Sequence, residues 1–158
     1  MIIEIFADNL TKEDISKNIH RSSRAIILRE DSLLFLHTKT LDYYMLPGGG
    51  IEKDETPEQA VVREVLEETG FKSQIIKKTL IIKEYFPEST WETHYFLCSI
   101  NEEEKVLPVF TSEEQDLKLE IIYLTIPEAL NILDNHDSNF IHAQNIMQRE
   151  FIAIANSL

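Results

Sequence analysis

Three glutamates near the middle of the chain have a spacing that could hold a metal ion. Glu64, Glu67 and Glu68 stand at positions i, i+3 and i+4, so on a helix their carboxylates lie close together. Converging carboxylate oxygens are the ligands that hard cations such as Mg²⁺ and Ca²⁺ prefer. The alternative is a solvated acidic face, which a chain of net charge −13 can readily display. The spacing alone leaves both interpretations open.

A glycine-rich segment before these glutamates favours the metal site. Gly48, Gly49 and Gly50 follow Pro47, and the only other glycine in the chain is Gly70. Glycine lets the backbone adopt unusual conformations and approach a ligand closely. This segment could therefore bring backbone groups near a phosphate or a metal ion.

The glutamates lie in a segment whose two ends carry helix signals. Thr56 is a good N-cap, Pro57 suits the first helical position and Gln59 completes a capping box. Gly70 stands where a left-handed residue ends a helix. These signals predict a helix over 57–69. The apolar face that we expect to pack against a sheet consists of Val61, Val62, Val65 and Leu66.

Apolar patterns predict the elements that surround this helix. The expected strands are residues 24–29, 32–37, 41–46, 74–86, 91–100 and 119–125, and the first two form a hairpin. The further helices are expected over 127–134 and 139–156. Strands in the middle of the chain with helices around them indicate a sheet covered by helices.

Composition and charge exclude several classes of protein. With 15 Lys and Arg against 28 Asp and Glu, we expect no binding to nucleic acid polymers or to anionic membranes. An anionic substrate would require a metal cation between it and the chain. Cys98 is the only cysteine, which excludes an internal disulfide or a cysteine-cluster zinc site. No apolar run reaches the roughly 18 residues of a membrane span and none is typical of a signal peptide, so we expect a cytoplasmic protein.

Taken in order, these residues resemble the signature of the Nudix hydrolases, here called the Nudix box. Its specified positions are filled without departure by Gly49, Glu55, Arg63, Glu64, Val65, Glu67, Glu68, Gly70 and Phe71. The segments 45–49 and 127–130 are similar to the flanks of the box in that family. The resemblance implies an α/β/α sandwich around a mixed β-sheet. We expect a single domain over 1–158, with its core at about 20–156.

The resemblance also implies an activity. Nudix hydrolases cleave a phosphoanhydride bond in a nucleoside diphosphate linked to another moiety, with water as the nucleophile and Mg²⁺ or Mn²⁺ as cofactor. A small nucleotide is then the expected partner, and a homodimer is compatible with the family. The alternatives are a Nudix fold that binds a nucleotide without cleaving it and an interaction module whose acidic helix is only solvated.

Carried onto this chain, the resemblance assigns roles within the box. Glu64, Glu67 and Glu68 are the implied metal ligands, with the backbone carbonyl of Gly48 as a further one. Arg63 is implied to orient the glutamates through an ion pair. Glu55 is implied to support them, although an acid before a helix is also favoured by the helix dipole alone.

The general base has more than one candidate. Within the box it is Glu67 or Glu64, and the rivals are carboxylates downstream, above all Glu114 and Glu120. Glu113 and Asp116 belong to the same acidic run, which as a whole could be a solvated loop.

Substrate recognition is expected outside the helix. The candidate contacts are Gly49 and Gly50 in the loop, Arg24 near a phosphate and Tyr44 against a base. Tyr43, Phe86, Trp91 and Tyr95 are further aromatic candidates, although aromatic residues in strands usually belong to the core. Pro87 stands sixteen residues after Phe71, where the family resemblance implies a proline in many members that act on ADP-ribose. It slightly favours ADP-ribose or another nucleotide sugar, with nucleoside triphosphates kept as equal candidates, but it could also simply end a strand. His37, His94, His136 and His142 have no metal-like spacing, and we assign them no role.

Overall fold

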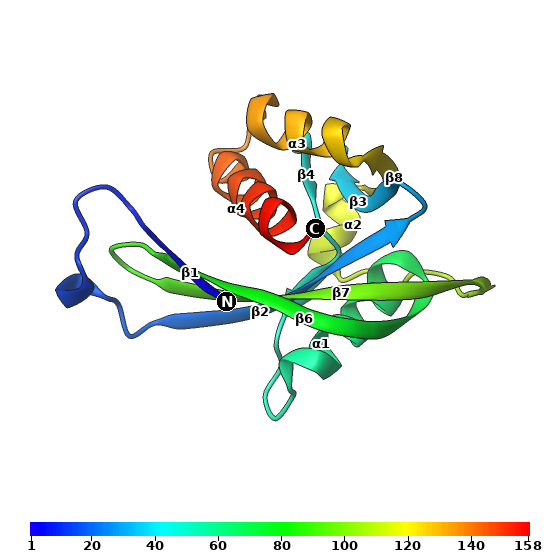
Figure 1. The fold of residues 1–158 in the computed structure, drawn as a ribbon, viewed down its shortest axis with the longest axis horizontal. Coiled ribbons are helices and arrows are strands. Elements are labelled where there is room, and N and C mark those ends of the chain that lie inside the picture. The colour runs from blue at the N-terminus through cyan, green and yellow to red at the C-terminus, as the bar shows by residue number, and fades with distance from the viewer.

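A computed structural model describes residues 1–158, which form one eight-stranded sheet with helices on both faces (Figure 1). The strands are β1 (Ile2–Phe6), β2 (Ile19–Arg29), β3 (Ser32–Thr38), β4 (Tyr43–Met45), β5 (Gly48–Gly50), β6 (Phe71–Tyr85), β7 (Thr90–Lys105) and β8 (Leu119–Thr125). The helices are α1 (Pro57–Thr69), α2 (Ser112–Leu117), α3 (Ile126–Asn135) and α4 (Ala143–Ser157), with a short 3-10 turn η1 at Lys12–Asp14.

The sheet contains both parallel and antiparallel strand pairs, and β2 connects the strands β1, β6 and β7 to the strands β3, β4 and β8. The strand order is β1-β6-β7-β2-β3-β4, with β5 beside β2 and β8 beside β3. The long strands β6 and β7 are antiparallel, whereas β1 runs parallel to β6 and β2 runs parallel to β7. Near its end β2 leaves β7 and pairs with β3 at Leu28 and Arg29. The short strand β5 pairs with β2 over Ser22–Arg24, which places the glycines against the middle of the sheet.

Two hydrophobic clusters fix the helices on opposite faces. Ile26 of β2 belongs to the larger cluster, which packs under α3 and α4. Its neighbours Ala25 and Ile27 point the other way and join Val61 and Val65 of α1. Figure 1 accordingly shows α3 and α4 on one side of the sheet and α1 on the other. The expected α/β/α sandwich around a mixed sheet is confirmed.

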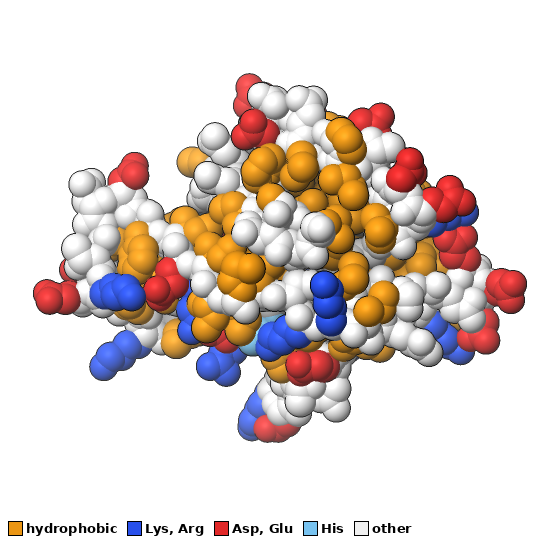
Figure 2. All heavy atoms as spheres, viewed as in Figure 1, with side chains coloured by type: hydrophobic (Ala, Val, Ile, Leu, Met, Phe, Trp, Pro, Cys, Tyr) orange, Lys and Arg blue, Asp and Glu red, His pale blue; other side chains and the backbone are white.

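The face drawn in Figure 2 shows how side chains of each kind are distributed. Hydrophobic side chains gather over α4 and the adjoining sheet, while acidic side chains are spread around the rim. The negative charge of the chain is therefore dispersed on this face. No helix is both long and apolar enough to cross a membrane.

Several expected boundaries need correction. The strands β1 and β5 and the helix α2 were not predicted, and the last helix begins at Ala143 rather than at 139. Val62, expected on the packed face of α1, is 37% exposed, because the residues facing the sheet are Ala60, Val61 and Val65. The other predicted strands and helices are present, with ends that differ by a few residues.

Candidate metal centre

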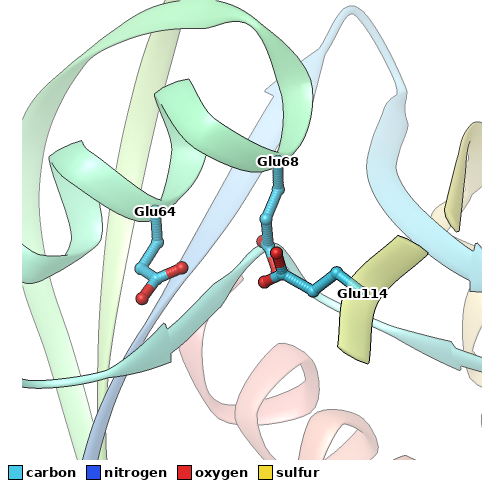
Figure 3. Close-up of side chains that lie close together, drawn as sticks. All are labelled: Glu64, Glu68 and Glu114. Carbon is cyan, nitrogen blue, oxygen red and sulfur yellow. The ribbon is translucent and has the colours of Figure 1, made fainter. Parts of the chain in front are cut away.

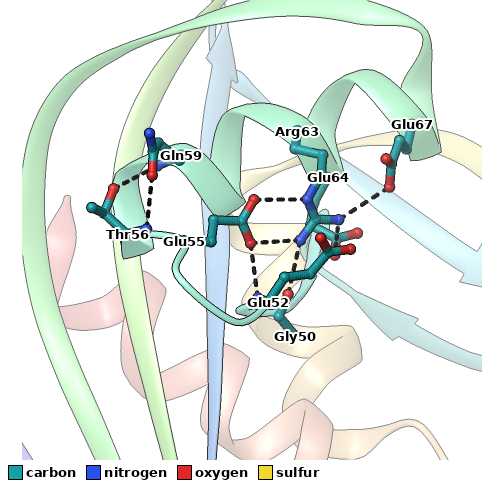
Figure 4. Close-up of polar contacts among 8 residues, drawn as sticks. All are labelled: Gly50, Glu52, Glu55, Thr56, Gln59, Arg63, Glu64 and Glu67. Atoms are coloured by element: carbon teal, nitrogen blue, oxygen red, sulfur yellow. Dashed lines mark hydrogen bonds and ion pairs between the residues drawn. The ribbon is translucent and has the colours of Figure 1, made fainter.

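The helix α1 begins and ends as its sequence predicts. The Thr56 side chain accepts a hydrogen bond from the Gln59 amide at 3.2 Å, and the Gln59 side chain accepts one from the Thr56 amide at 2.9 Å (Figure 4). At the other end Gly70 adopts the left-handed conformation with φ 78°, and its amide donates to the Leu66 carbonyl. Both ends of the helix that carries the glutamates are thus fixed by local contacts.

Two of the box glutamates are buried on α1, and the third is not. Glu64 is 7% exposed and Glu68 is 3% exposed, whereas the Glu67 side chain is 40% exposed. Carboxylate oxygens of Glu64, Glu68 and Glu114, the last from α2, lie within 4.8 Å of one another. Figure 3 shows the Glu114 side chain reaching Glu68 from the opposite direction, with Glu64 beside them. We call these three residues the carboxylate cluster.

The glycines of β5 make room for this cluster. The Gly48 amide donates a hydrogen bond of 2.7 Å to the Glu68 carboxylate. A Cβ atom at Gly49 would lie 2.6 Å from Glu64 Oε1, and one at Gly48 would overlap the Ser23 carbonyl. Gly48 also has φ 144°, a conformation that other residues rarely adopt. The glycines therefore allow the backbone to lie directly against the buried carboxylates.

Arg63 connects the glycine segment to the glutamates. Its Nη1 donates to Glu64 Oε1 at 2.8 Å and to Glu67 Oε2 at 3.2 Å (Figure 4). Its Nε and Nη2 donate to the two oxygens of Glu55, and Nη2 also donates to the Gly50 carbonyl at 2.9 Å. The structure thus contains the expected ion pairs between Arg63 and the glutamates, and the role of Arg63 in orienting them stays a prediction. The bidentate contact lowers the pKa of Glu55, which keeps this carboxylate ionised.

The cluster concentrates negative charge in a desolvated place. Burial raises the pKa of Glu64, although the Arg63 guanidinium opposes this shift. Burial also raises the pKa of Glu68 well above its usual range, against the opposing effects of Arg24 and the Gly48 amide. Three carboxylates so close together repel one another unless protons or a cation neutralise them. An all-oxygen donor set fits Mg²⁺ or Mn²⁺ better than a cation that prefers nitrogen and sulfur ligands.

Among the downstream acids, the structure brings only Glu114 to the cluster. Its Oε2 accepts a hydrogen bond of 2.7 Å from the Thr111 amide, while Thr111 Oγ1 accepts one from the Glu114 amide. Glu120 instead contacts His37 and Lys39 on β3 and in the turn that follows it. The sequence suggested Glu114 as a base but not as a candidate metal ligand. The signal that could have found its helix is the capping box Thr111-x-x-Glu114.

The expected substrate contacts lie in different surroundings. The Arg24 side chain is 12% exposed, donates to the Leu46 carbonyl at 2.6 Å and lies 3.3 Å from Glu150. Tyr44 stacks on His37 with ring centroids 4.5 Å apart. Gly49 and Gly50 border the cluster through Glu64 and Arg63. The substrate roles of Arg24, Tyr44, Gly49 and Gly50 remain predictions.

The other aromatic candidates separate into core and surface. Tyr43 and Tyr95 are buried, and the Tyr95 hydroxyl accepts a hydrogen bond from Arg149. Trp91 is exposed and stacks on His20. Pro87 lies in the tight turn between β6 and β7, so its position agrees with the structural alternative.

Comparison with known proteins shows what this chain is similar to. The NUDIX domain family model matches residues 19–144. A MutT-like protein of Streptomyces ambofaciens is 40% identical over 74 residues, which cover 46% of this chain and 48% of that protein. The 8-oxo-dGTP diphosphatase of Escherichia coli is 46% identical over 54 residues, covering 31% of this chain and 42% of that enzyme.

Solved structures of other proteins have a similar fold. The crystal structure of a UDP-X diphosphatase superposes with a TM-score of 0.63 at 15% identity, covering 87% of this chain and 62% of that one. The chain spans about half the length of the curated relatives it matches first. The family model covers most of the chain, and its range includes the whole Nudix box and the carboxylate cluster. The chain therefore belongs to the NUDIX domain family.

Proposed function

We propose that this protein hydrolyses a phosphoanhydride bond in a nucleoside diphosphate linked to another moiety, with Mg²⁺ as cofactor and Mn²⁺ as a substitute. The observation that carries the proposal is the carboxylate cluster of Glu64, Glu68 and Glu114 beside the glycine strand β5. Family membership supports the reaction class. The relative from Escherichia coli is named a diphosphatase, which also supports cleavage between phosphates.

The chain's own residues supply the binding geometry. Glu68 and Glu114 would hold the cation, since their carboxylate oxygens belong to the cluster, and the Gly48 carbonyl is the further ligand that the family resemblance implies. When bound, the cation neutralises phosphate charge and favours ionisation of the attacking water. Arg63 fixes Glu64 and the Gly50 backbone in one arrangement, so the loop and the helix keep their spacing. Gly49 and Gly50 leave the backbone accessible to phosphate oxygens.

Glu64 is the proposed proton acceptor, with Glu67 as the alternative. Arg63 holds one Glu64 oxygen at 2.8 Å, so its carboxylate is oriented within the cluster. Water attacks phosphorus, its proton passes to the base, and the anhydride oxygen leaves with the departing phosphate. Glu67 carries an exposed carboxylate outside the cluster and contacts Arg63 at 3.2 Å. The two are distinguished by the pH profile of kcat, whose acidic limb should disappear in the Gln variant of the true base.

Fewer observations support a particular substrate than support the reaction class. The net charge of −13 favours a small nucleotide held through a cation over a nucleic acid polymer. Damaged nucleoside triphosphates and ADP-ribose are both candidates, the first through the name of the relative from Escherichia coli and the second through Pro87. A cytoplasmic location and a homodimer stay predictions, to be checked by cell fractionation and light scattering.

A substrate panel tests the proposal. Nucleoside triphosphates, 8-oxo-dGTP, ADP-ribose, nucleotide sugars and dinucleoside polyphosphates would be assayed with Mg²⁺ and with Mn²⁺. We expect metal-dependent turnover of at least one class and its loss in Glu68→Gln. Glu58→Gln is the matched control, because Glu58 is exposed on the same helix and lies outside the cluster. If no substrate were turned over but calorimetry showed tight nucleotide binding, the result would instead support a Nudix fold that binds a nucleotide without cleaving it.

A further inference from the structure

A second group of charged side chains surrounds the turn between β3 and β4. His37 Nδ1 lies 2.8 Å from Glu120 Oε1 on β8, and His37 Nε2 lies 2.8 Å from Asp42 Oδ1 in the turn. A protonated imidazole donates from both nitrogens, so it can bind both carboxylates at once. A neutral imidazole donates from only one. His37 therefore links the turn to β8 most completely when it carries a proton.

The neighbouring groups favour that protonated form. Burial lowers the pKa of His37, but its hydrogen bonds with Glu120 and Asp42 prevail and raise it. Lys39 contacts Glu120 Oε2 at 2.9 Å, and His136 at the end of α3 contacts the carbonyl and the carboxylate of Asp42. Tyr44 stacks on His37 from β4. These are the charged and titratable groups that face His37.

The same turn holds the end of α2. Thr40 Oγ1 donates a hydrogen bond of 2.7 Å to the Asp116 carbonyl. The amides of Lys39 and Thr40 donate to the carbonyls of Lys118 and Leu117, each at 3.3 Å. All three acceptors lie in or directly after the last turn of α2, so the position of this turn determines where the helix ends.

The helix α2 has little else to hold it. It contains six residues, and none of them is buried. The segment before it is fixed to α1, because the Val109 amide donates to the Glu67 carbonyl and the Val106 amide donates to the Gly70 carbonyl. The helix that carries Glu114 is thus attached at two ends, to α1 on one side and to the β3–β4 turn on the other.

From these contacts we infer that His37 is a positioning residue: by binding Asp42 and Glu120 it fixes the β3–β4 turn, and the turn holds α2 so that Glu114 meets Glu68. This inference rests on the proposed function, since it concerns the metal affinity of the carboxylate cluster. His37 does not touch the cluster itself. It acts through Asp42, Thr40 and the backbone of α2.

Direct measurement of Mn²⁺ binding tests the inference without relying on turnover. Free Mn²⁺ would be quantified by electron paramagnetic resonance against wild type, His37→Ala, Glu114→Gln and the double variant. We expect His37→Ala to weaken Mn²⁺ binding about threefold to tenfold, the scale of one lost hydrogen bond. The double variant should bind no more weakly than Glu114→Gln alone, because His37 acts only through Glu114.

A second variant keeps the test valid if His37→Ala fails to fold. Thr40→Val removes the exposed hydroxyl that donates to Asp116 and keeps the shape of the side chain. It should weaken Mn²⁺ binding in the same direction. Thr79→Val is the matched control, because the Thr79 hydroxyl also donates to a backbone carbonyl, that of Tyr95 in the sheet. This control should bind Mn²⁺ like wild type.

The pH dependence separates positioning by charge from a purely structural role. As pH rises above about 6.5, the ordinary pKa of histidine, and passes through the raised pKa of His37, the ratio of the His37→Ala and wild-type dissociation constants should fall. His136→Gln should keep this pH dependence. A constant ratio, or unchanged affinity in both His37→Ala and Thr40→Val while Glu114→Gln binds weakly, would overturn this inference alone. Absence of Mn²⁺ binding by wild type would overturn the proposed function with it.

Discussion

On the α1 side of the candidate metal centre, the helix that carries Glu64 and Glu68 is anchored by its own Val61 and Val65, which are fully buried. On the α2 side, the helix that carries Glu114 has no buried residue and depends on hydrogen bonds at its two ends. One half of the site is therefore part of the hydrophobic core, and the other half is attached to its edge. Elements held by few buried contacts open more easily.

This difference teaches how the cluster can be both rigid and responsive. The buried half fixes two carboxylates before any ligand arrives, at the cost of desolvating them. The attached half can move without disturbing the core, so its carboxylate can adjust to a ligand. Changes on the two sides should accordingly differ in their effects on activity and on stability.

The largest expected effect follows from Glu68→Gln on the buried side. Activity should fall about a thousandfold, since a metal ion supplies several kcal/mol of transition-state stabilisation and each 1.36 kcal/mol is a factor of ten. The metal-free protein should not become less stable, because glutamine still accepts the Gly48 amide and removes one of three neighbouring charges. Steady-state kinetics and thermal melting in EDTA measure the two quantities. A large loss of melting temperature with little loss of activity would contradict the assignment of Glu68.

The corresponding change on the attached side should have a smaller effect. Glu114→Gln should lower activity about tenfold to a hundredfold at limiting Mg²⁺, the range seen when groups that support a metal site are removed. The loss should be partly recovered at high Mg²⁺, because the two α1 carboxylates remain in place. Glutamine can still complete the capping box with Thr111, so α2 itself is retained. Glu113→Gln on the same helix is the control, and an equal loss there would indicate a general charge effect.

The same contrast explains which parts of the site the sequence could predict. The helix α1 was predicted because Thr56, Gln59 and Gly70 act on their immediate neighbours, and local signals of this kind are visible in the sequence. Glu114 was not predicted as a ligand, because its place beside Glu68 depends on contacts such as Thr40 with Asp116, 76 residues apart. A helix of six residues without a buried face also leaves no apolar periodicity.

Long-range pairing explains the other omissions in the fold. The strand β1 is placed by parallel pairing with β6, for example between Ile3 and Ile82. No residue pattern near β1 in the sequence indicates that β6 is its partner. Similarly, β5 consists of three glycines, which have low strand propensity, and becomes a strand because β2 lies beside it. The burial of Arg24 against Leu46 and Glu150 likewise depends on α4, which lies more than a hundred residues away.

A third prediction concerns Gly70, which connects the two sides. Its left-handed backbone ends α1, and a Cβ atom there would overlap the Val106 carbonyl at the start of the segment leading to α2. Gly70→Ala should therefore reduce the free energy of unfolding by about 1–3 kcal/mol, the usual cost of a strained backbone conformation. Urea denaturation measures this change. Gly50→Ala is the control, because no atom lies within 4 Å of a Cβ placed there, and a comparable loss in both variants would contradict the argument.

The smallest expected effect is the pH dependence of stability that His37 contributes without metal. Because the pKa of His37 is raised in the folded protein, its contribution is complete below the unfolded pKa of about 6.5 and is lost as pH rises through the folded pKa. His37 also lowers the pKa of Asp42 and of Glu120, so those carboxylates are ionised at every pH at which His37 loses its proton. The difference in unfolding free energy between wild type and His37→Gln, measured by urea denaturation in EDTA from about pH 5.5 to 8.5, should therefore shrink as pH rises. A difference that stayed constant would mean that His37 supports the turn through packing on Tyr44 rather than through its charge.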